Sequence, residues 1–318
     1  MTDPLSPESR VWVAGHNGLV GSALLRRLKA EGLSRLLVAS HAELDLRNQA
    51  ATRAWVAANR PDAVFLAAAT VGGIQANVTR PADFLYDNLM IAANVLEACA
   101  TSGNAKVLVL GSSCIYPREA PQPIPEEALL GGPLEPTNEA YAVAKIAALK
   151  LAQAYRKQHG SRFISAMPSN LYGPGDNFDL ATAHVLPALI RKFHEAGQSG
   201  TVTVWGSGRP KREFLHVDDL ADALVFLMRR YDDAAPINVG TGEDETIVEL
   251  AARVRDIVAP RAHIVFDATK PDGTPRKLLD VSRLRALGWK HRIGLDEGIR
   301  STWEWYKQTG GKRQGASQ

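Results

Sequence analysis

The sequence is poor in cysteine and has no long apolar run. Only two of its 318 residues are cysteines, Cys99 and Cys114, and they can neither build a disulfide framework nor supply the spacing of metal ligands. The N-terminal MTDPLSPESR lacks the basic and apolar regions of a signal peptide, and the apolar stretch AVFLAAATVGGI is too short to span a bilayer. These absences predict a cytoplasmic protein without a metal site.

Charge of one sign is not gathered anywhere along the chain. The 37 basic and 34 acidic residues give a formal net charge of +3, and the lysines and arginines are scattered, which argues against a nucleic-acid partner. A hydrophobic content of 45% is ordinary for a globular enzyme with a large core. Small anionic ligands remain compatible with this composition.

Short apolar runs alternate with longer amphipathic stretches from Arg10 onward. The runs RVWVAG, RLLVAS, AVFLAAA, KVLVLGSS and FISAMPSN are apolar throughout, as buried parallel strands are. The alternation predicts an α/β fold, a doubly wound parallel sheet of the Rossmann type over residues 1–170. We expect residues 214–240 to join this cofactor-binding domain.

The pattern is less regular after residue 170, where a smaller α/β lobe for the substrate is expected from residues 171–213 and 241–308. Residues 117–138 contain six prolines and no periodicity, which predicts a long functional loop. The polar residues 309–318 are expected to form a disordered tail. Four helices are expected, at residues 141–159, 181–196, 218–230 and 246–258.

Three glycines follow the first expected strand in VWVAGHNGLVGSALLRRL. Gly15, Gly18 and Gly21 have the spacing G-x-x-G-x-x-G between a strand and an amphipathic helix. Glycine lets the backbone approach a pyrophosphate, and the N-terminus of the helix attracts its charge. This stretch therefore predicts a dinucleotide-binding loop.

The second expected strand ends in Ser40 and His41, where an NAD-binding protein usually carries an acidic residue. A hydroxyl and an imidazole suit the 2′-phosphate of NADP better than the bare ribose of NAD. NADP is therefore the expected cofactor, although this strand end lacks a strong arginine clamp.

Tyr141 and Lys145 are four residues apart in EAYAVAKIAALKLAQAY, on one face of an expected helix. A lysine ammonium beside a phenol favours the phenolate, so that the tyrosine can exchange a proton with a carbonyl oxygen. Such a pair alone is common on solvated helices. Together with the glycine loop and with Ser112 at the end of the fourth expected strand, it predicts carbonyl chemistry.

These three elements resemble the extended short-chain dehydrogenase/reductase family, in which Ser, Tyr and Lys act on a carbonyl beside the nicotinamide. The resemblance covers nearly the whole chain, through LGSSCIYP, PSNLYGPGDNF, VWGSGRPKREFLHVDD and KPDGTPRKLLDVSRLRALGW. It is most specific for the members that epimerise C3 and C5 of GDP-4-keto-6-deoxy-D-mannose and reduce C4 with NADPH, giving GDP-L-fucose. The resemblance thus implies an enzyme of nucleotide-sugar biosynthesis that is both an isomerase and an NADP-dependent oxidoreductase.

The same resemblance assigns roles to residues of this chain. It makes Cys114 the base and His184 the acid of the epimerisations, while Ser112 and Tyr141 stabilise the enolate oxygen and Lys145 supports the tyrosine and the ribose. The cofactor-binding residues that it implies are Gly15, Asn17, Gly18, Leu19, Val20, Gly21, Ser40, His41, Leu110, Gly111, Ser112, Ser113, Tyr141, Lys145, Pro168, Ser169, Asn170, Leu171 and His184. The residues that it implies for the GDP part are Lys192, Trp205, Arg212 and Asp272.

Several positions qualify this assignment. A free thiol is mostly protonated at pH 7, so we expect positive charge near Cys114, whereas Cys99 is expected in the core of a helix. Some family members carry arginines where this chain has Asn17 and His41, which predicts weaker cofactor selectivity. Lys192 likewise replaces an arginine and loses its bidentate geometry.

Other functions stay open for this sequence. One is an epimerase-reductase for a related GDP-4-keto sugar, such as a 3,6-dideoxy sugar or a heptose. A UDP-sugar 4-epimerase that retains NAD is disfavoured by the missing acid after the second strand and by Cys114 with His184, and a non-catalytic dinucleotide sensor is disfavoured by the intact Ser112, Tyr141 and Lys145. A homodimer is expected, formed by the helices around residues 83–101 and 141–159.

Overall fold

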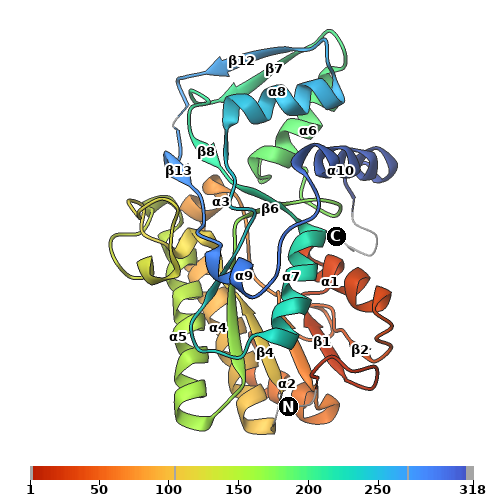
Figure 1. Ribbon diagram of the computed structural model, residues 1–318, viewed down its shortest axis with the longest axis vertical. Helices are drawn as coiled ribbons and strands as arrows, with labels where there is room; N and C mark the ends of the chain where they lie inside the picture. The colour runs from red at the N-terminus through yellow and green to blue at the C-terminus, as the bar shows by residue number, and fades with distance from the viewer. Residues whose placement is uncertain (1–2, 104, 271, 313–318) are drawn as a thin grey trace.

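The computed structural model describes residues 3–103, 105–270 and 272–312, and its largest layer is a six-stranded parallel sheet (Figure 1). The strands lie in the order β10-β5-β4-β3-β1-β2, and every neighbouring pair is parallel. Their bounds are Val11–Ala14 (β1), Leu36–Leu37 (β2), Ala63–Leu66 (β3), Lys106–Leu110 (β4), Phe163–Pro168 (β5) and Ile237–Val239 (β10). The predicted fold class is confirmed.

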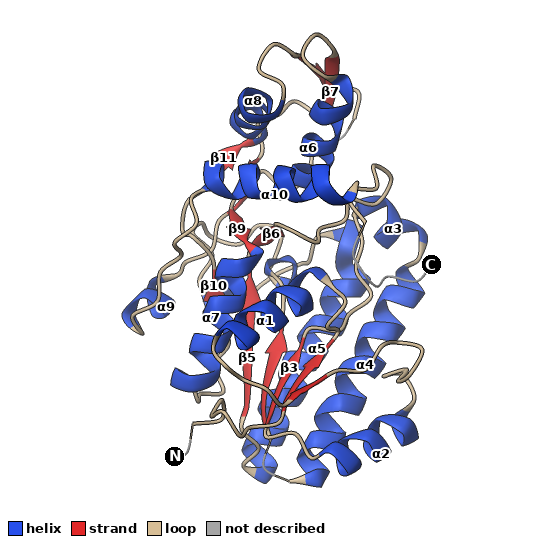
Figure 2. Ribbon diagram, turned by 90° about the vertical axis from the view of Figure 1, so that its right-hand side faces the viewer, coloured by secondary structure: helices blue, strands red, loops and turns tan. Residues whose placement is uncertain are grey.

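Helices cover both faces of this sheet (Figure 2). Leu19–Ala30 (α1) and Val217–Arg230 (α7) pack on one face, and Gln49–Asn59 (α2), Pro81–Ser102 (α4) and Glu139–His159 (α5) pack on the other. Successive residues of a strand point to opposite faces, so Val13 and Trp12 of β1 belong to different cores. Because both faces are buried, apolar side chains fill β1 without alternation.

A second group of elements lies beyond the carboxyl ends of the sheet strands, at the top of Figure 1. Its core includes Phe193, Leu250 and Ile299, one from each of three helices. The helices are Val185–Ala196 (α6), Ile247–Val258 (α8) and Leu295–Thr309 (α10), and the short strands are Thr201–Trp205 (β7), Lys211–Arg212 (β8), Glu245–Thr246 (β11), His263–Asp267 (β12) and Arg276–Lys277 (β13). Ile74–Thr79 (α3) and Ser282–Ala286 (α9) complete the helices, with Asn170–Tyr172 (β6) paired to Phe214–His216 (β9).

The four helices expected from residue 141 onward are α5, α6, α7 and α8. The expected start of α6 at residue 181 is wrong, because the helix begins at Val185. Before it, the Asp179 carboxylate accepts the N–H of Ala181 at 2.8 Å and the Asn177 amide donates to the Thr182 hydroxyl at 2.8 Å. Such local side-chain hydrogen bonds compete with helix formation.

The structure also bears on the expected loop, the expected tail and the expected domain boundaries. Within residues 117–138, Glu126–Ala128 (η2) and Pro136–Asn138 (η3) form short 3-10 turns, and the buried Ile124 bridges to Leu279. Within the expected tail, α10 ends at Thr309 and hydrogen bonds continue through the following turn to Lys312; residues 313–318 lie outside the described residues, and the tail stays a prediction. β10 and α7 belong to the large sheet and its cover, whereas β9 pairs with β6; the predicted domain boundaries stay a prediction.

Within the part of the chain that the structure describes, the helices are too short or too polar to cross a bilayer.

A buried carboxylate joins the two groups of elements. Glu213, between β8 and β9, is fully buried and accepts hydrogen bonds from the N–H groups of Thr241 at 2.6 Å, Gly242 at 2.8 Å and Leu279 at 2.9 Å. Gly240 is obligatory beside it, because a Cβ there would lie 2.1 Å from Glu213 Oε1. Glu213 therefore fixes β8 against the end of β10 and the segment after β13.

Asn238 of β10 makes a second junction. Its side-chain amide donates to the carbonyls of Ile124 at 2.9 Å and Asp280 at 3.0 Å, and its Oδ1 accepts from the Tyr116 hydroxyl at 2.6 Å. Asn238 is completely buried, so these hydrogen bonds replace water that the side chain cannot reach. They hold the loop after β4 against the segment after β13.

Removing the Glu213 carboxylate should destabilise the fold. Glu213→Ala leaves three buried N–H groups unpaired, each costing about 1–3 kcal/mol, so we expect the free energy of unfolding to fall by about 3 kcal/mol or more. Urea unfolding measures this loss. Glu243→Ala, at an exposed position nearby, is the control and should change stability by less than about 0.5 kcal/mol; equal stability of the two variants would contradict the structural role of Glu213.

Candidate active site

The expected site residues gather where the carboxyl ends of the sheet strands meet the upper elements. The loops after β1, β4 and β5 lie at this edge, and α5, α6, β8 and β13 lie above or beside it (Figure 1). In doubly wound folds, ligands bind outside the carboxyl ends of the strands. This edge is therefore the candidate active site.

The glycine loop after β1 leaves no room for side chains. A Cβ at Gly15 would lie 2.6 Å from Ala68 Cα, and one at Gly21 would lie 2.1 Å from the Gly15 carbonyl oxygen. Gly15 also has φ +88, a conformation that glycine adopts at low cost. Gly18 caps α1 without a side chain, and no acidic residue occupies the first turn, so the N-terminus of α1 fits a pyrophosphate.

The segment after β5 offers a buried hydroxyl. Ser169 is 7% exposed, and its Oγ has no hydrogen-bond partner within the described part of the chain, a state that a bound polar ligand would relieve. The neighbouring Asn170 side chain instead donates to the Glu213 carbonyl at 2.8 Å. The glycine cradle and this hydroxyl fit a dinucleotide, whereas the Asn170 amide is engaged within the protein.

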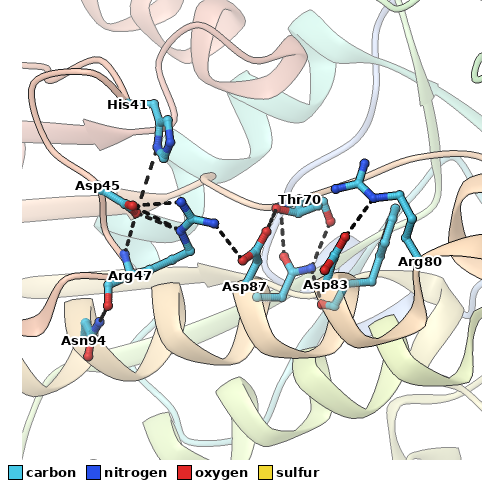
Figure 3. A network of polar contacts seen from close by, with 10 residues as sticks. His41, Asp45, Arg47, Thr70, Arg80, Asp83, Asp87 and Asn94 are labelled. Atoms are coloured by element: carbon cyan, nitrogen blue, oxygen red, sulfur yellow. Dashed lines mark hydrogen bonds and ion pairs between the residues drawn. The ribbon is translucent and has the colours of Figure 1, made fainter.

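His41 lies in the loop after β2, and its side chain is exposed (Figure 3). Its Nδ1 lies 4.0 Å from an oxygen of Asp45. Arg47, the nearest following arginine in the sequence, binds Asp45 at 2.8 Å and Asp87 of α4 at 3.0 Å. Because two carboxylates hold this guanidinium, Arg47 connects the loop to α4, and the exposed His41 is the side chain that this loop offers to a phosphate.

Tyr141 and Lys145 lie on α5 beside the end of β4. Lys145 is buried, its Nζ donates to the Leu110 carbonyl at 3.0 Å, and burial lowers the pKa of its ammonium to about 8. The Nζ is 5.8 Å from the centre of the Tyr141 ring.

The expected phenolate is not what this arrangement favours. Burial raises the pKa of Tyr141, the nearby Cys114 charge adds to the rise, and hydrogen bonding with the Ser112 hydroxyl only partly offsets both. The charge of a nearby lysine would lower the pKa of the phenol, but the loss of water around the phenol raises it, and this second effect is the larger one for Tyr141. The raised pKa of Tyr141 thus favours the protonated phenol.

Cys114 lies in a 3-10 turn (η1, Ser113–Ile115) that Ser112 caps, with the Ser112 Oγ accepting the Cys114 N–H at 3.2 Å. The side chain is half-buried, and its sulfur is 3.7 Å from Lys277 Nζ of β13. Burial raises the pKa of the thiol, but the charges of Lys277 and Arg212, with hydrogen bonds from Ser112 and Lys277, outweigh burial and hold the pKa below its usual value.

His184 is the N-cap residue of α6, at the edge of the same site. Its side chain reaches solvent, yet partial desolvation and, second, the charge of Lys277 lower its pKa. A protonated His184 would therefore release its proton readily.

The residues implied for the GDP part lie beyond the thiol. Trp205 at the end of β7 is 66% exposed, and its ring is 5.9 Å from Lys192 Nζ and 5.6 Å from Lys270 Nζ. Asp272 accepts hydrogen bonds from the N–H and hydroxyl of Ser207 at 2.9 Å and 2.7 Å. An exposed aromatic face flanked by cations is suited to stacking a base and pairing with a diphosphate.

Arg212 connects these two regions, because its charge acts both on Cys114 and on Asp272. Lys277 is the residue that the sequence assignment missed. We expected positive charge near Cys114, but Lys277 is 163 residues from the thiol along the chain. The local sequence of β13 contains no pattern that identifies Lys277 as a site residue. Only the pairing of β13 with β8 brings it into the site.

Comparisons with known proteins agree with this geometry. Residues 11–240 match the model of the NAD dependent epimerase/dehydratase family. The chain is 58% identical over 300 residues to probable GDP-L-fucose synthase 1 of Oryza sativa subsp. japonica, covering 93% of this chain and 92% of that protein.

Solved structures are similar over nearly the whole chain. A GDP-L-fucose synthetase from Naegleria fowleri bound to NADP has a TM-score of 0.89 and 30% identity, covering 96% of this chain and 94% of that one. A GDP-6-OMe-4-keto-L-xylo-heptose reductase from C. jejuni has a TM-score of 0.90 and 36% identity, covering 95% and 99%.

Filling the glycine cradle should weaken cofactor binding. Gly21→Ala places a methyl group 2.1 Å from the Gly15 carbonyl oxygen, so the turn must open and its N–H groups shift from the pyrophosphate position. We expect the Kd for NADPH to rise by about tenfold or more, about 1.4 kcal/mol, in a fluorescence titration. Gly294→Ala, where a Cβ meets no atom within 4 Å, is the control; unchanged affinity of Gly21→Ala would argue against this loop as the cofactor site.

Proposed function

The chain belongs to the NAD dependent epimerase/dehydratase family, and we propose that it epimerises C3 and C5 of GDP-4-keto-6-deoxy-D-mannose and reduces C4 with NADPH to give GDP-L-fucose. It is thus an NADP-dependent oxidoreductase and isomerase. Similarity to a rice GDP-L-fucose synthase over 93% of the chain supports this function. The observation in the site that carries it is the Cys114 thiol, held 3.7 Å from Lys277 beside Ser112 and Tyr141.

Epimerisation needs a base and an acid on opposite faces of the sugar. The ketone at C4 acidifies the protons on C3 and C5, so a base can remove each proton and an acid can return one from the other side. We assign the base to Cys114, whose pKa is lowered, and the acid to His184 at the start of α6. Ser112 and Tyr141 stabilise the enolate oxygen that forms at C4.

Reduction uses the same oxygen. NADPH, bound along the glycine loop, supplies the hydride to C4. Tyr141 donates its proton to the C4 oxygen, for which its raised pKa keeps it protonated until charge develops there. Lys145, one turn further along α5 and anchored to the Leu110 carbonyl at the end of β4, supports Tyr141.

The GDP part is assigned to the region around Trp205. We infer that the base stacks on the exposed Trp205 ring, that Lys192 and Arg212 pair with the diphosphate, and that Asp272 accepts N–H groups of the guanine. The Lys192 amine and the Asp272 carboxylate are already engaged with Thr203 and Ser207, so binding would exchange or share these hydrogen bonds.

A related GDP-4-keto sugar is the alternative substrate. The chain is 36% identical to a GDP-heptose reductase, which supports this alternative. It is 58% identical to a GDP-L-fucose synthase, which supports the proposed function more strongly. If the protein left GDP-4-keto-6-deoxy-D-mannose untouched in the presence of NADPH and reduced a 3-deoxy analogue or a heptose, the alternative would replace the proposed function.

We propose that the reaction takes place in the cytoplasm, a reducing compartment in which thiols stay free, since both Cys99 and Cys114 are unpaired.

We further propose a homodimer formed through α4 and α5. Tyr86 and Leu89 of α4 are 59% and 37% exposed, and Val143 of α5 is 42% exposed. Exposed apolar side chains gathered on adjacent helices are typical of an interface.

Incubation in heavy water tests the catalytic assignment. We expect deuterium at C3 and C5 of the product, and Cys114→Ser should suppress this exchange about 10²-fold or more, since it removes the base. Tyr141→Phe should nearly abolish reduction of C4, measured as NADPH oxidation. Cys99→Ala, in the buried core of α4, is the matched control and should exchange normally; exchange at the wild-type rate in Cys114→Ser would refute the role of the thiol.

The dimer can be tested separately. Tyr86→Glu with Leu89→Glu places charge in the proposed interface, so sedimentation should find monomers where the wild-type protein sediments as a dimer. Val265→Glu, at a 50% exposed position on β12, should leave the dimer intact. A monomeric wild-type protein would rule this interface out.

A further inference from the structure

Cys114 is the base only while its sulfur carries negative charge, and β13 supplies the residue that faces it. Lys277 Nζ lies 3.7 Å from Cys114 Sγ. The two residues belong to different groups of elements, since η1 follows the large sheet and β13 lies in the three-stranded sheet with β8 and β11. Their contact therefore crosses the site.

The position of Lys277 is fixed by strand register. Lys277 is paired with Arg212 in the parallel ladder of β13 and β8, so the two cations stand side by side on one rung. Glu213 follows Arg212 directly and accepts the N–H of Leu279, two residues after Lys277. The backbone around both cations is thus held by one buried carboxylate.

Lys277 differs from the other cations that line the cavity beside the thiol in having no acidic partner within ion-pair distance. A small polar cavity of about 10 Å³ adjoins Cys114, about the size of one water molecule. Of the cations that line it, Arg118 lies 3.6 Å from Glu135 and Arg276 binds Asp244 at 2.6 Å. Among the described residues, no carboxylate lies within ion-pair distance of Lys277, so its charge is available to the sulfur.

We propose that Lys277 is a positioning residue that holds the Cys114 sulfur as a thiolate and so makes it a base. This inference rests on the proposed function for its consequence in catalysis, but not for the state of the thiol itself. An ammonium 3.7 Å from a sulfur in a half-buried site attracts the thiolate more strongly than water would.

Because the reaction includes two epimerisations, the Cys114 sulfur must carry its negative charge twice in each turnover. After Cys114 removes the first proton, it is a thiol and must release that proton to solvent before it can act on the second carbon. The Lys277 amine beside the sulfur favours this release each time. The titratable and charged groups that face Cys114 from the surrounding elements are Tyr141 of α5, Arg212 of β8, Lys277 of β13, and Arg118, Glu135 and Arg276 around the cavity, while His184 before α6 interacts with Lys277.

The same charge acts on both members of the acid and base pair. Lys277 lowers the pKa of Cys114 and that of His184, so it favours the deprotonated sulfur and makes the imidazolium a stronger acid. The thiolate in turn raises the pKa of Tyr141, which keeps the phenol protonated for the reduction.

The pH dependence of thiol alkylation tests the proposal without substrate. Cys99 is 1% exposed and burial raises its pKa to about 12, so iodoacetamide reports on Cys114, and intact mass counts the labels. We expect a midpoint below about 8.5 in the wild-type protein. In Lys277→Met the midpoint should rise by about 1–3 pH units, and alkylation at pH 7 should slow about tenfold or more.

Two variants separate charge from structure. Lys277→Arg keeps a cation beside the sulfur and should retain a low midpoint, whereas Lys211→Met removes a lysine from the exposed face of the neighbouring strand and should titrate as the wild type does. Thermal unfolding and NADPH binding check that Lys277→Met is folded. A profile for folded Lys277→Met that superimposes on the wild-type profile overturns the proposal, and so does an equal shift in Lys277→Arg.

Heavy-water exchange links the thiol to the reaction. At pH 7, Lys277→Met should incorporate deuterium at C3 and C5 about tenfold more slowly than wild type and recover at higher pH, in step with its alkylation profile. If Lys277 only bound the substrate, the variant would raise KM and leave the alkylation profile unchanged, which also overturns the proposal. A wild-type protein with a low thiol midpoint that exchanges neither proton would refute the proposed function and leave the alkylation result standing.

Discussion

Three backbone N–H groups converge on the buried carboxylate of Glu213, and the geometry of the site depends on them. The residue before Glu213 is Arg212, and Lys277 lies two residues before one of the N–H donors, so the hydrogen bonds that hold the fold also set the positions of two cations beside Cys114. Asn238 adds the other half of the frame, because its contact with Tyr116 fixes the turn that carries the thiol. A buried acceptor with several donors is costly to disturb, which makes this junction rigid.

Opposite shifts in the pKa values of Cys114 and Tyr141 follow from burial and from the cations beside the thiol, Lys277 and Arg212. Burial alone would keep both Cys114 and Tyr141 protonated. Lys277 is close enough to reverse the balance at the sulfur, while Tyr141 lies beside a buried lysine whose amine is turned to the Leu110 carbonyl. One group can then accept a proton and the other can donate one, as an enzyme that epimerises and reduces the same sugar requires.

The cofactor side of the site combines a rigid turn with an open surface. The glycine loop packs so closely that side chains are excluded, and it admits a pyrophosphate by its shape. In the loop after β2, His41 is exposed, and Arg47 is bound by Asp45 and Asp87 (Figure 3). That Ser40 and His41 recognise the 2′-phosphate stays a prediction; the Ser40 hydroxyl donates to Glu43 at 2.7 Å, and this pair would be a weaker arrangement than an arginine clamp.

The amino-acid sequence by itself determined the parts of this protein that depend on neighbours along the chain: alternating strands and helices, the glycine turn, Tyr141 and Lys145 on one helical face, and Cys114 two residues after Ser112. The sequence pattern did not predict that α6 begins as late as Val185, because the side chains of Asp179 and Asn177 form local hydrogen bonds that compete with the helix. Only the tertiary structure decided which cation faces the thiol and which groups keep their protons. Electrostatic interaction depends on distance through space, and Lys277 reaches Cys114 across 163 residues through a two-residue ladder with β8. A shift of one residue in that ladder would bring Arg276, already paired with Asp244, to the place of Lys277.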